Sequence, residues 1–447
     1  MKQRALLLLA GAVLATQLVL AYVYCGFLTG DEVEPLSEAF RIATDYRYES
    51  WDARNTFVAR FAIAPWIWAA THLGVTSRAA LVVIATIPFA LATAITILLV
   101  HLLTLRWSGD RIAAGAATIL FALHWLPLGF GSTTYPRVIA MLCIVGGAAL
   151  IPRAPWLTGA LMGIAFADRY SEAIYLPPLC IAAFRHGGFK SAMKVALGAV
   201  LSIAVTSGIY EWILWGSPFH NLRTWTSLTI LEGKISARAT SQPPWWFLTM
   251  LPRWCALTLL PLLWAARRRM FEAWCFFLLP LAALTFISHK ELRFLQSVIP
   301  FLAILAGAGF AVWWHTRRRL AIALLAISVV WNLWGLRFLG RETKPAVQAA
   351  RFLATRPQLK TIALGQIWAY GDRIYLGNGP RLIDVGTPLH SLDVALPAAD
   401  AVAVFASDVT PETEAAIEKQ GFINAHQFVG PRSRDVIVFI RRADTAP

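Results

Sequence analysis

The sequence predicts an all-α polytopic membrane protein that ends in a small α/β domain. Of its 447 residues, 57% are hydrophobic, with 19 Trp and 25 Phe, which is too apolar for a soluble globular protein. Long apolar runs separated by short basic loops fill residues 1–340, whereas shorter apolar runs alternate with turn residues beyond them. We therefore expect a transmembrane domain over residues 1–340 and an extracytoplasmic α/β domain over residues 341–447.

The formal net charge of +15 reflects membrane orientation rather than a polyanionic partner. Lys and Arg fall mainly in short loops between apolar runs, which is the positive-inside pattern, and residues 341–447 carry almost no net charge. Nucleic acid is therefore not expected as a partner. The five cysteines lie in or beside apolar runs without metal-ligand spacing, so neither a disulfide framework nor a zinc site is predicted.

Residues 5–28 predict the first membrane span. They follow a basic start and are longer than the apolar core of a signal peptide, which favours an uncleaved span over a cleaved one. Because the basic start stays in the cytoplasm, residues 29–65 form the first outer loop. This loop holds seven acidic residues and is expected to carry two short amphipathic helices that lie at the membrane interface.

Further apolar runs bring the expected number of transmembrane helices to about eleven. They are residues 81–105, 112–130, 138–151, 156–167, 170–184, 192–215, 247–266, 271–287, 295–314 and 320–339. With this count the basic turns all fall on the cytoplasmic side, and the tail lies outside. In the tail, residues 361–364, 373–376, 401–405 and 436–440 are predicted strands, and residues 413–419 are a predicted helix.

Four ionisable side chains stand within five residues at 289–293, between two long apolar runs. Charges at a membrane boundary are costly unless they reach water, a partner or a ligand, so this cluster is a candidate site. The alternative is an ordinary hydrophilic loop. The sequence of residues 289–294, His-Lys-Glu-Leu-Arg-Phe, resembles the His-Lys-Glu-x-Arg-Phe signature of glycosyltransferase family 22.

Family 22 comprises polyprenol-phosphate-mannose-dependent α-mannosyltransferases of the multispanning GT-C fold. The resemblance implies that residues 1–340 form a GT-C catalytic domain. It also implies an inverting enzyme that moves mannose or a similar sugar from a polyprenyl-phosphate donor. The acceptor would be a hydroxyl of a lipid-linked glycan or glycolipid on the extracytoplasmic side, where nucleotide sugars are not supplied.

Two acidic residues, Asp31 and Glu32, follow the first span directly. The resemblance implies that Asp31 is the catalytic base, since family members carry an acidic residue in this loop. An ionised carboxylate within hydrogen-bond reach can take the proton of the attacking hydroxyl. Glu32 is a candidate for orienting the substrate. Taken without the resemblance, an acidic pair at this place is more typical of a helix N-cap.

Residues 49–54, Glu-Ser-Trp-Asp-Ala-Arg, resemble the Thr-Trp-Glu-Tyr-Arg stretch of the family's first loop, with Ser50 and Asp52 as departures. The resemblance makes Trp51, Asp52 and Arg54 candidates for binding or orienting the substrate. The face of Trp51 would stack on a sugar ring, or the side chain would anchor the loop at the interface.

The leaving group of the donor is the lipid phosphate, which is already a good anion, so positively charged donors that hold this phosphate should suffice. Lys290, Arg293 and His289 are the candidates in the signature, with His289 and Arg293 on one helix face and Glu291 orienting one of them. Arg169 is a further candidate, since family members carry an arginine in a comparable position. It would otherwise pair locally with an acidic neighbour.

No metal ligand and no cofactor is predicted, although a divalent cation is left open because Glu32 and Glu34 stand close together. The expected partners are the polyprenyl-phosphate sugar donor, the glycolipid or lipid-linked glycan acceptor, and membrane lipid. Frequent arginine favours a bacterial inner membrane with a periplasmic active site; in a eukaryote the location would be the endoplasmic reticulum membrane.

Two alternative functions remain open at this point. One is a GT-C transferase with another sugar or acceptor, such as aminoarabinose transfer or protein O-mannosylation. The other is a non-enzymatic transporter of lipid-linked oligosaccharide. A transporter is expected to show paired halves and charges deep in several spans, neither of which is evident in this sequence.

Overall fold

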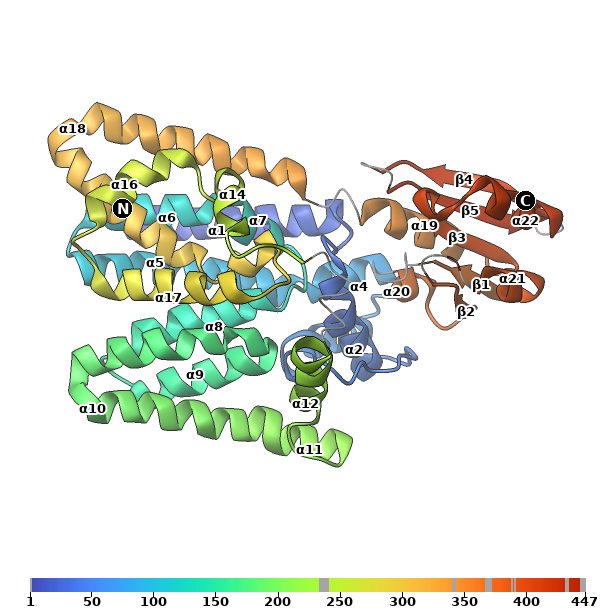
Figure 1. Cartoon of the computed structure of the whole chain (residues 1–447), viewed down its shortest axis with the longest axis horizontal. Coiled ribbons are helices and arrows are strands. Elements are labelled where there is room, and N and C mark those ends of the chain that lie inside the picture. The colour runs from blue at the N-terminus through green and yellow to red at the C-terminus, as the bar shows by residue number, and fades with distance from the viewer. Residues whose placement is uncertain are drawn as a thin grey trace. The chain divides into compact units, whose positions relative to one another are not determined.

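The computed structural model describes residues 2–232, 241–339, 343–365, 372–386, 389, 391–430 and 434–442. The chain divides into two compact units, each described by itself below (Figure 1). The first unit consists of residues 1–19, 51–61 and 87–337. The second unit consists of residues 20–50, 62–86 and 338–447, so segments near the first outer loop belong with the C-terminal tail.

The first unit is a bundle of helices (Figure 1). Its described helices are α1 (Gln3–Val23), α5 (Ile87–Ser108), α6 (Arg111–Ala122), α7 (Trp125–Phe130), α8 (Arg137–Leu150), α9 (Pro155–Asp168), η3 (Tyr170–Tyr175), α10 (Leu176–Ile203), η4 (Ala204–Ile209), α11 (Tyr210–Trp215), α12 (His220–Thr226), η5 (Ser227–Leu231), α14 (Trp246–Thr249), α15 (Leu251–Trp254), η6 (Leu257–Leu259), α16 (Leu260–Ala266), α17 (Phe271–Phe286), η7 (Leu292–Leu295) and α18 (Ile299–Gly335).

Small residues bring two of these helices together. A Cβ atom added to Gly159 of α9 would lie 2.1 Å from the Val195 carbonyl oxygen of α10, and one added to Gly198 of α10 would lie 2.5 Å from the Trp156 carbonyl oxygen of α9. A Cβ atom added to Gly163, four residues after Gly159, would lie 2.3 Å from the Cβ atom of Ser202. This spacing of small residues is the usual means by which membrane helices approach closely.

Two long helices are each interrupted where the sequence places a turn between two spans. In α10, Gly187 and Gly188 leave the helical region, with φ of −144° and 66°. In α18, Arg317 does so with φ of −142°. These positions confirm the breaks expected between residues 170–184 and 192–215, and between residues 295–314 and 320–339.

Four helices are long and apolar enough to cross a membrane: Gln3–Val23, Arg78–Ser108, Tyr170–Trp215 and Ile299–Gly335. Shorter apolar helices lie at Arg111–Ala122, Arg137–Leu150, Leu257–Ala266 and Phe271–Phe286. The helical character expected for this part of the chain is therefore confirmed. The count of about eleven spans remains a prediction.

Polar contacts join several of the basic turns at one end of the bundle. His315 Nε2 lies 3.6 Å from the Asp110 carboxylate. Arg185 forms an ion pair of 2.8 Å with Glu272, and Arg106 donates a hydrogen bond to the Ala149 carbonyl. This grouping agrees with the single side expected for these turns; the identity of that side remains a prediction.

The second unit contains a five-stranded sheet with helices around it. Its strands are β1 (Thr361–Leu364), β2 (Arg381–Asp384), β3 (Ala401–Phe405), β4 (Phe422–Phe428) and β5 (Val436–Arg441), in the order β2-β1-β3-β5-β4. β1 is parallel to β2 and β3, whereas β5 is antiparallel to β3 and β4. Its described helices are η1 (Gly30–Glu32), α2 (Val33–Ala43), α3 (Ala64–His72), α4 (Arg78–Ala85), α19 (Lys344–Ala354), α20 (Asp372–Leu376), α21 (Leu392–Ala395), η10 (Leu396–Ala398), η11 (Ala406–Asp408) and α22 (Pro411–Lys419).

The expected strands at residues 361–364, 401–405 and 436–440 are confirmed, as is the helix at residues 413–419. The strand predicted at residues 373–376 is wrong, because this segment lies in helix α20. A short apolar run of this length fits a buried helical turn as well as a strand, and here Ile374 and Tyr375 are both buried on the helix. Tyr375 Oη donates to the Cys25 carbonyl, and its ring lies beneath the Arg351 guanidinium.

The two short helices expected within residues 29–65 are present. The first is α2, whose capping turn begins at Thr29. The second begins as the π-helical segment η2 (Ala59–Ile63) and continues as α3. Within the second unit α2 packs against α3, and the Arg78 side chain of α4 covers the ring of Tyr46. Their location at a membrane interface remains a prediction.

Candidate active site

The signature at residues 289–294 lies between helices rather than on one. α17 ends at Phe286, and η7 begins only at Leu292. The expectation that His289 and Arg293 share a helix face is therefore wrong, because the backbone at Glu291 is extended, with φ of −139° and ψ of 149°. Instead the Glu291 carboxylate joins them, since its Oε1 atom lies 2.9 Å from His289 Nε2 and 2.7 Å from Arg293 Nη2.

The Lys290 side chain points inward. Its ammonium donates hydrogen bonds to the carbonyl oxygens of Gln242, at 3.0 Å, and of Ile287. An ammonium has three donors, so two are used here and one is left for a ligand. Burial lowers the pKa of Lys290, because the side chain is only 4% exposed. Backbone contacts of Ser241 with His289 and of Gln242 with Ser288 fix this segment further.

A buried ion pair that was not predicted from the sequence contacts the signature at Phe294. Arg137, at the start of α8, pairs with Glu172 of η3, and the two side chains are 3% and 0% exposed. Arg137 also donates to the Phe294 carbonyl, and its guanidinium lies 4.9 Å from the centre of the Phe294 ring. The sequence signal was a basic residue directly before an apolar run at the outer end of an expected span.

Arg169 lies at the turn between α9, which ends at Asp168, and η3, which begins at Tyr170. Its backbone amide closes α9 by donating to Ala165, and its own carbonyl accepts from the Glu172 amide. The neighbouring Asp168 carboxylate accepts from the Ala140 amide at 3.1 Å and lies within the electrostatic influence of Arg169 and Arg54. The corner is thus a place where cationic and anionic side chains gather at the end of the bundle.

The Trp51-to-Arg54 segment is positioned by α12. Asn221 Nδ2 donates to the Asp52 carbonyl at 2.8 Å, and His220 Nε2 lies 3.4 Å from the Asp52 carboxylate. The Arg54 guanidinium lies 5.8 Å from the centre of the Trp51 ring. Trp51 is 40% exposed, so part of a large aromatic side chain is accessible beside a cation.

A second missed residue, Glu211, organises this region from the inside. The carboxylate is fully buried and accepts hydrogen bonds from Asn55 Nδ2 at 2.6 Å, from Tyr170 Oη at 3.2 Å and from the Asn221 amide at 2.9 Å. It therefore ties the first-loop segment, the η3 corner and α12 to one point. The signal was an acidic residue inside the apolar run at residues 192–215, which is costly unless it is partnered.

Helix η3 joins all of these groups. Tyr170 contacts the Glu211 cluster, whereas Ser171 and Glu172 contact Arg137 and through it the signature at Phe294. The first unit thus brings together, at one end of its bundle, the predicted residues Trp51, Asp52, Arg54, Arg169, His289, Lys290, Glu291 and Arg293. Such a collection of cationic donors and one accessible aromatic ring is suited to binding a phosphorylated sugar.

The predicted base belongs to the second unit. Thr29 Oγ1 accepts from the Asp31 amide at 3.3 Å, and the Thr29 amide and hydroxyl donate to Glu32 Oε2 at 3.1 and 2.6 Å. This is a capping box, and the sequence Thr-Gly-Asp-Glu signals it. Glu32 is buried in that role, whereas the Asp31 side chain is partly exposed at the tip of the turn.

The sequence model of the Alg9-like mannosyltransferase family matches residues 55–360, more than half of the chain and including the signature. The chain belongs to the Alg9-like mannosyltransferase family. This assignment confirms the resemblance to family 22 that residues 289–294 carry. By family, the protein is a glycosyltransferase.

Solved structures place this family member in the GT-C fold. ArnT from Cupriavidus metallidurans, determined in complex with undecaprenyl phosphate, has a TM-score of 0.64 at 15% sequence identity, and the match covers 98% of each chain. The Archaeoglobus fulgidus oligosaccharyltransferase AglB, in complex with an inhibitory peptide and a dolichol-phosphate, has a TM-score of 0.51 at 12% identity and is matched over 98% of this chain and 75% of its own. No curated protein sequence matches the chain.

Within the described ranges, no group of three or more His, Cys, Asp or Glu side chains could hold a metal ion. The acidic residues considered for a cation have other partners: Glu32 closes the capping box, and Glu34 accepts from Tyr48 Oη. Glu38 is bound by Arg41 through two hydrogen bonds, of 2.9 and 2.5 Å.

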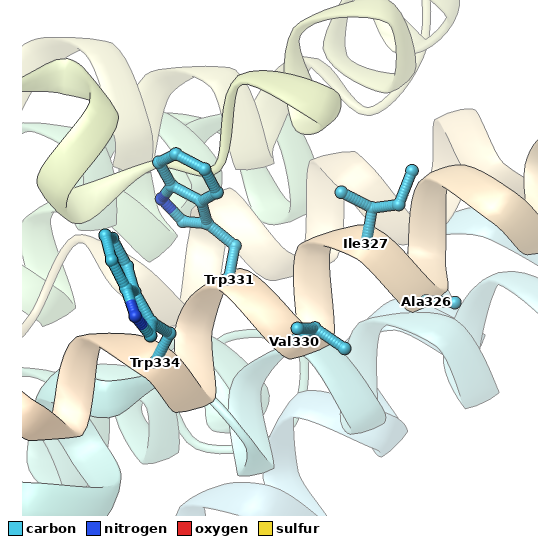
Figure 2. Close-up of a pocket in the computed structure, with 5 residues that line it drawn as sticks. All are labelled: Ala326, Ile327, Val330, Trp331 and Trp334. Carbon is cyan, nitrogen blue, oxygen red and sulfur yellow. The ribbon is translucent and has the colours of Figure 1, made fainter.

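A surface hollow on the first unit is lined by none of the candidate site residues. Figure 2 shows its lining along one face of α18: Ala326, Ile327, Val330, Trp331 and Trp334. The lining holds no charged side chain, and Trp331 Nε1 is already bonded to the Pro252 carbonyl. A sugar phosphate would find no counter-charge there, so the polar end of the bundle is the better candidate for the active site.

Proposed function

We propose that this family member is an inverting transferase that moves mannose, or a similar sugar, from a polyprenyl-phosphate donor. The acceptor is a hydroxyl of a lipid-linked glycan or glycolipid at the extracytoplasmic face of the membrane. The observation that carries the proposal is the convergence of the family signature, the Arg169 corner and the Trp51 segment at one end of the bundle.

The donor phosphate is held by cations whose orientation is set by neighbouring groups. His289 and Arg293 are both aligned by Glu291, and Arg169 approaches from the η3 corner. Lys290 contributes its remaining N–H donor. A guanidinium offers two parallel donors to a phosphate, and the charge that develops on the leaving phosphate makes these contacts stronger in the transition state.

Asp31 acts as the base in this proposal. As the acceptor oxygen forms its bond to the anomeric carbon, the bond from that carbon to the phosphate oxygen breaks, and the hydroxyl proton passes to the Asp31 carboxylate. Trp51 stacks on the sugar, while Asp52, Arg54 and Glu32 orient it or the turn that carries the base. The proposal requires Asp31 to come within reach of the same sugar phosphate as Arg293.

The test uses the purified full chain with labelled polyprenyl-phosphate-mannose and candidate lipid acceptors. Asp31→Asn is expected to lower turnover by roughly 10²–10⁴-fold, the usual contribution of a general base. Asp45→Asn is the matched control, since Asp45 is an exposed acid of the same loop. Undiminished turnover in Asp31→Asn removes Asp31 as the base, and transfer of a sugar other than mannose would revise the donor.

The shared location of Asp31 and the cations has a separate test. Asp31→Cys and His289→Cys are combined in a cysteine-free background and treated with oxidants or short cross-linkers. Cross-linking by reagents no longer than a sugar phosphate supports one site. Failure of the pair to cross-link, while both single variants remain folded and accessible to thiol reagents, contradicts it.

A further inference from the structure

The turn between α16 and α17 forms a second surface cavity, at the opposite end of α17 from the signature at residues 289–294. Its lining is Arg267, Arg268, Arg269, Phe271, Trp274 and Leu278. All three arginines are exposed, and Phe271 and Leu278 expose about half of their surfaces. The cavity thus has a cationic rim and an apolar wall that continues along α17.

The positive charge of this rim is not neutralised locally. The neighbouring acidic residue, Glu272, is engaged by Arg185 through an ion pair of 2.8 Å. Among the described residues, Arg268 and Arg269 form no ion pair with an acidic side chain. Three adjacent guanidinium groups repel one another, so an anion placed among them is stabilised by all three.

The backbone holds the arginines in this arrangement at some cost. Met270 has φ of 57° and ψ of 56°, a left-handed conformation that is unfavourable for any residue with a Cβ atom. It reverses the chain so that α17 begins directly after the arginine triplet. Trp274 Nε1 donates to the Ala266 carbonyl at 3.3 Å, which fixes the cavity wall to the end of α16. Strain of this kind is typical of binding sites.

The surroundings are those expected where a membrane helix ends. The Arg267 guanidinium lies 4.2 Å from the centre of the Trp264 ring, and tryptophan is enriched at membrane–water interfaces, with Lys and Arg in the adjoining loops. The polar contacts described above also place the α16–α17 turn with the basic turns of the bundle, through Arg185 and Glu272. An occupant of this cavity therefore has a polar head in water and an apolar tail beside α17.

We propose that this cavity binds an anionic phospholipid, whose phosphate is held by Arg267, Arg268 and Arg269 and whose acyl chain lies against Phe271, Trp274 and Leu278. Basic pockets at the ends of membrane helices recognise anionic head groups in this way. The site is independent of the proposed transferase activity and lies outside its residues. It gives the protein a preference for membranes rich in acidic lipid.

The test measures lipid retained by the detergent-purified full chain, by native mass spectrometry, after incubation with phosphatidylglycerol or phosphatidylcholine. The wild type is expected to retain phosphatidylglycerol preferentially. The double variant Arg268→Gln/Arg269→Gln is expected to lose that preference by roughly thirtyfold, because each arginine contributes separately to anionic-lipid binding. Arg318→Gln/Arg319→Gln is the matched control, another exposed arginine pair of the bundle, and should keep it.

Three results would overturn the proposal. They are equal retention of the two lipids by the wild type, an equal loss in the control variant, and displacement of the lipid by millimolar inorganic phosphate. A stronger retention of undecaprenyl phosphate than of phosphatidylglycerol at this site would likewise replace the phospholipid with a polyprenyl lipid. Thermal unfolding of both double variants in detergent shows whether they remain folded.

Discussion

Removing the acid of the buried Arg137–Glu172 pair is expected to destabilise the first unit strongly. Both side chains are almost fully buried, so Glu172→Ala leaves a guanidinium without its counter-charge in a low-dielectric interior. Arg137 then keeps a 2.9 Å hydrogen bond to Ser171 Oγ, a long one of 3.4 Å to the Phe294 carbonyl and its contact with the Phe294 ring, none of which supplies a negative charge. Breaking such a pair from one side costs about 3–5 kcal/mol of unfolding free energy.

The assay is an unfolding equilibrium in mixed micelles, followed by tryptophan fluorescence. Glu272→Ala is the matched control, because its partner Arg185 is 51% exposed and a pair of that kind contributes about 1 kcal/mol or less. The double variant Arg137→Met/Glu172→Leu, which replaces both charges by apolar side chains, should recover most of the loss. Equal, small losses for Glu172→Ala and Glu272→Ala would refute the reasoning.

Three further predictions follow from single contacts. Thr29→Ala removes the cap before Asp31 and should lower the unfolding free energy by about 1 kcal/mol, measured by thermal unfolding. Gly159→Ala places a Cβ atom against the Val195 carbonyl of α10 and should cost about 1–3 kcal/mol in the same assay; unchanged stability would contradict so close an approach of the two helices. Burial lowers the pKa of Lys290, so as the pH rises this side chain loses its charge before the ordinary lysine pKa of about 10.4 is reached. Transfer activity that needs the charge should fall over the same rise in pH, and Lys290→Arg should extend activity to higher pH. Between the lowered pKa of Lys290 in the folded chain and its ordinary value in the unfolded chain, the unfolded chain binds more protons than the folded one. The free energy of unfolding should therefore rise with pH over this range.

Most of the fold could be predicted because its signals are local. Apolar runs fix where helices lie, and the glycine pair at 187–188 and the basic segment around Arg317 mark where long helices break. The central strands β3 and β5 are apolar along their length and were predicted almost to the residue. The edge strands β2 and β4 were not predicted. Most of their side chains are partly or fully exposed, so their sequences are polar and lack the apolar pattern of a central strand.

The residue types of the candidate site were predicted from the sequence, but the contacts between their side chains were not. The signature and the Arg169 corner were found from short motifs, which are visible in one stretch of sequence. Arg137 and Glu211 were missed, because each looks like an isolated charge at or inside an apolar run. Their importance depends on partners far away in sequence: Glu211 binds Asn55, 156 positions earlier, and Arg137 reaches Phe294, 157 positions later.

The sequence by itself determined the class of this protein: an apolar, basic chain with helices long and apolar enough to cross a membrane and a signature at residues 289–294 that marks its family. Hydropathy and short motifs are properties of neighbouring residues, so they need no folded structure to be recognised. Only the tertiary structure decided which charges become partners, since a buried ion must find its counter-charge wherever the fold places it. That is why Glu291 joins His289 and Arg293 across an extended segment, and why Glu211 holds three distant segments at one end of the bundle.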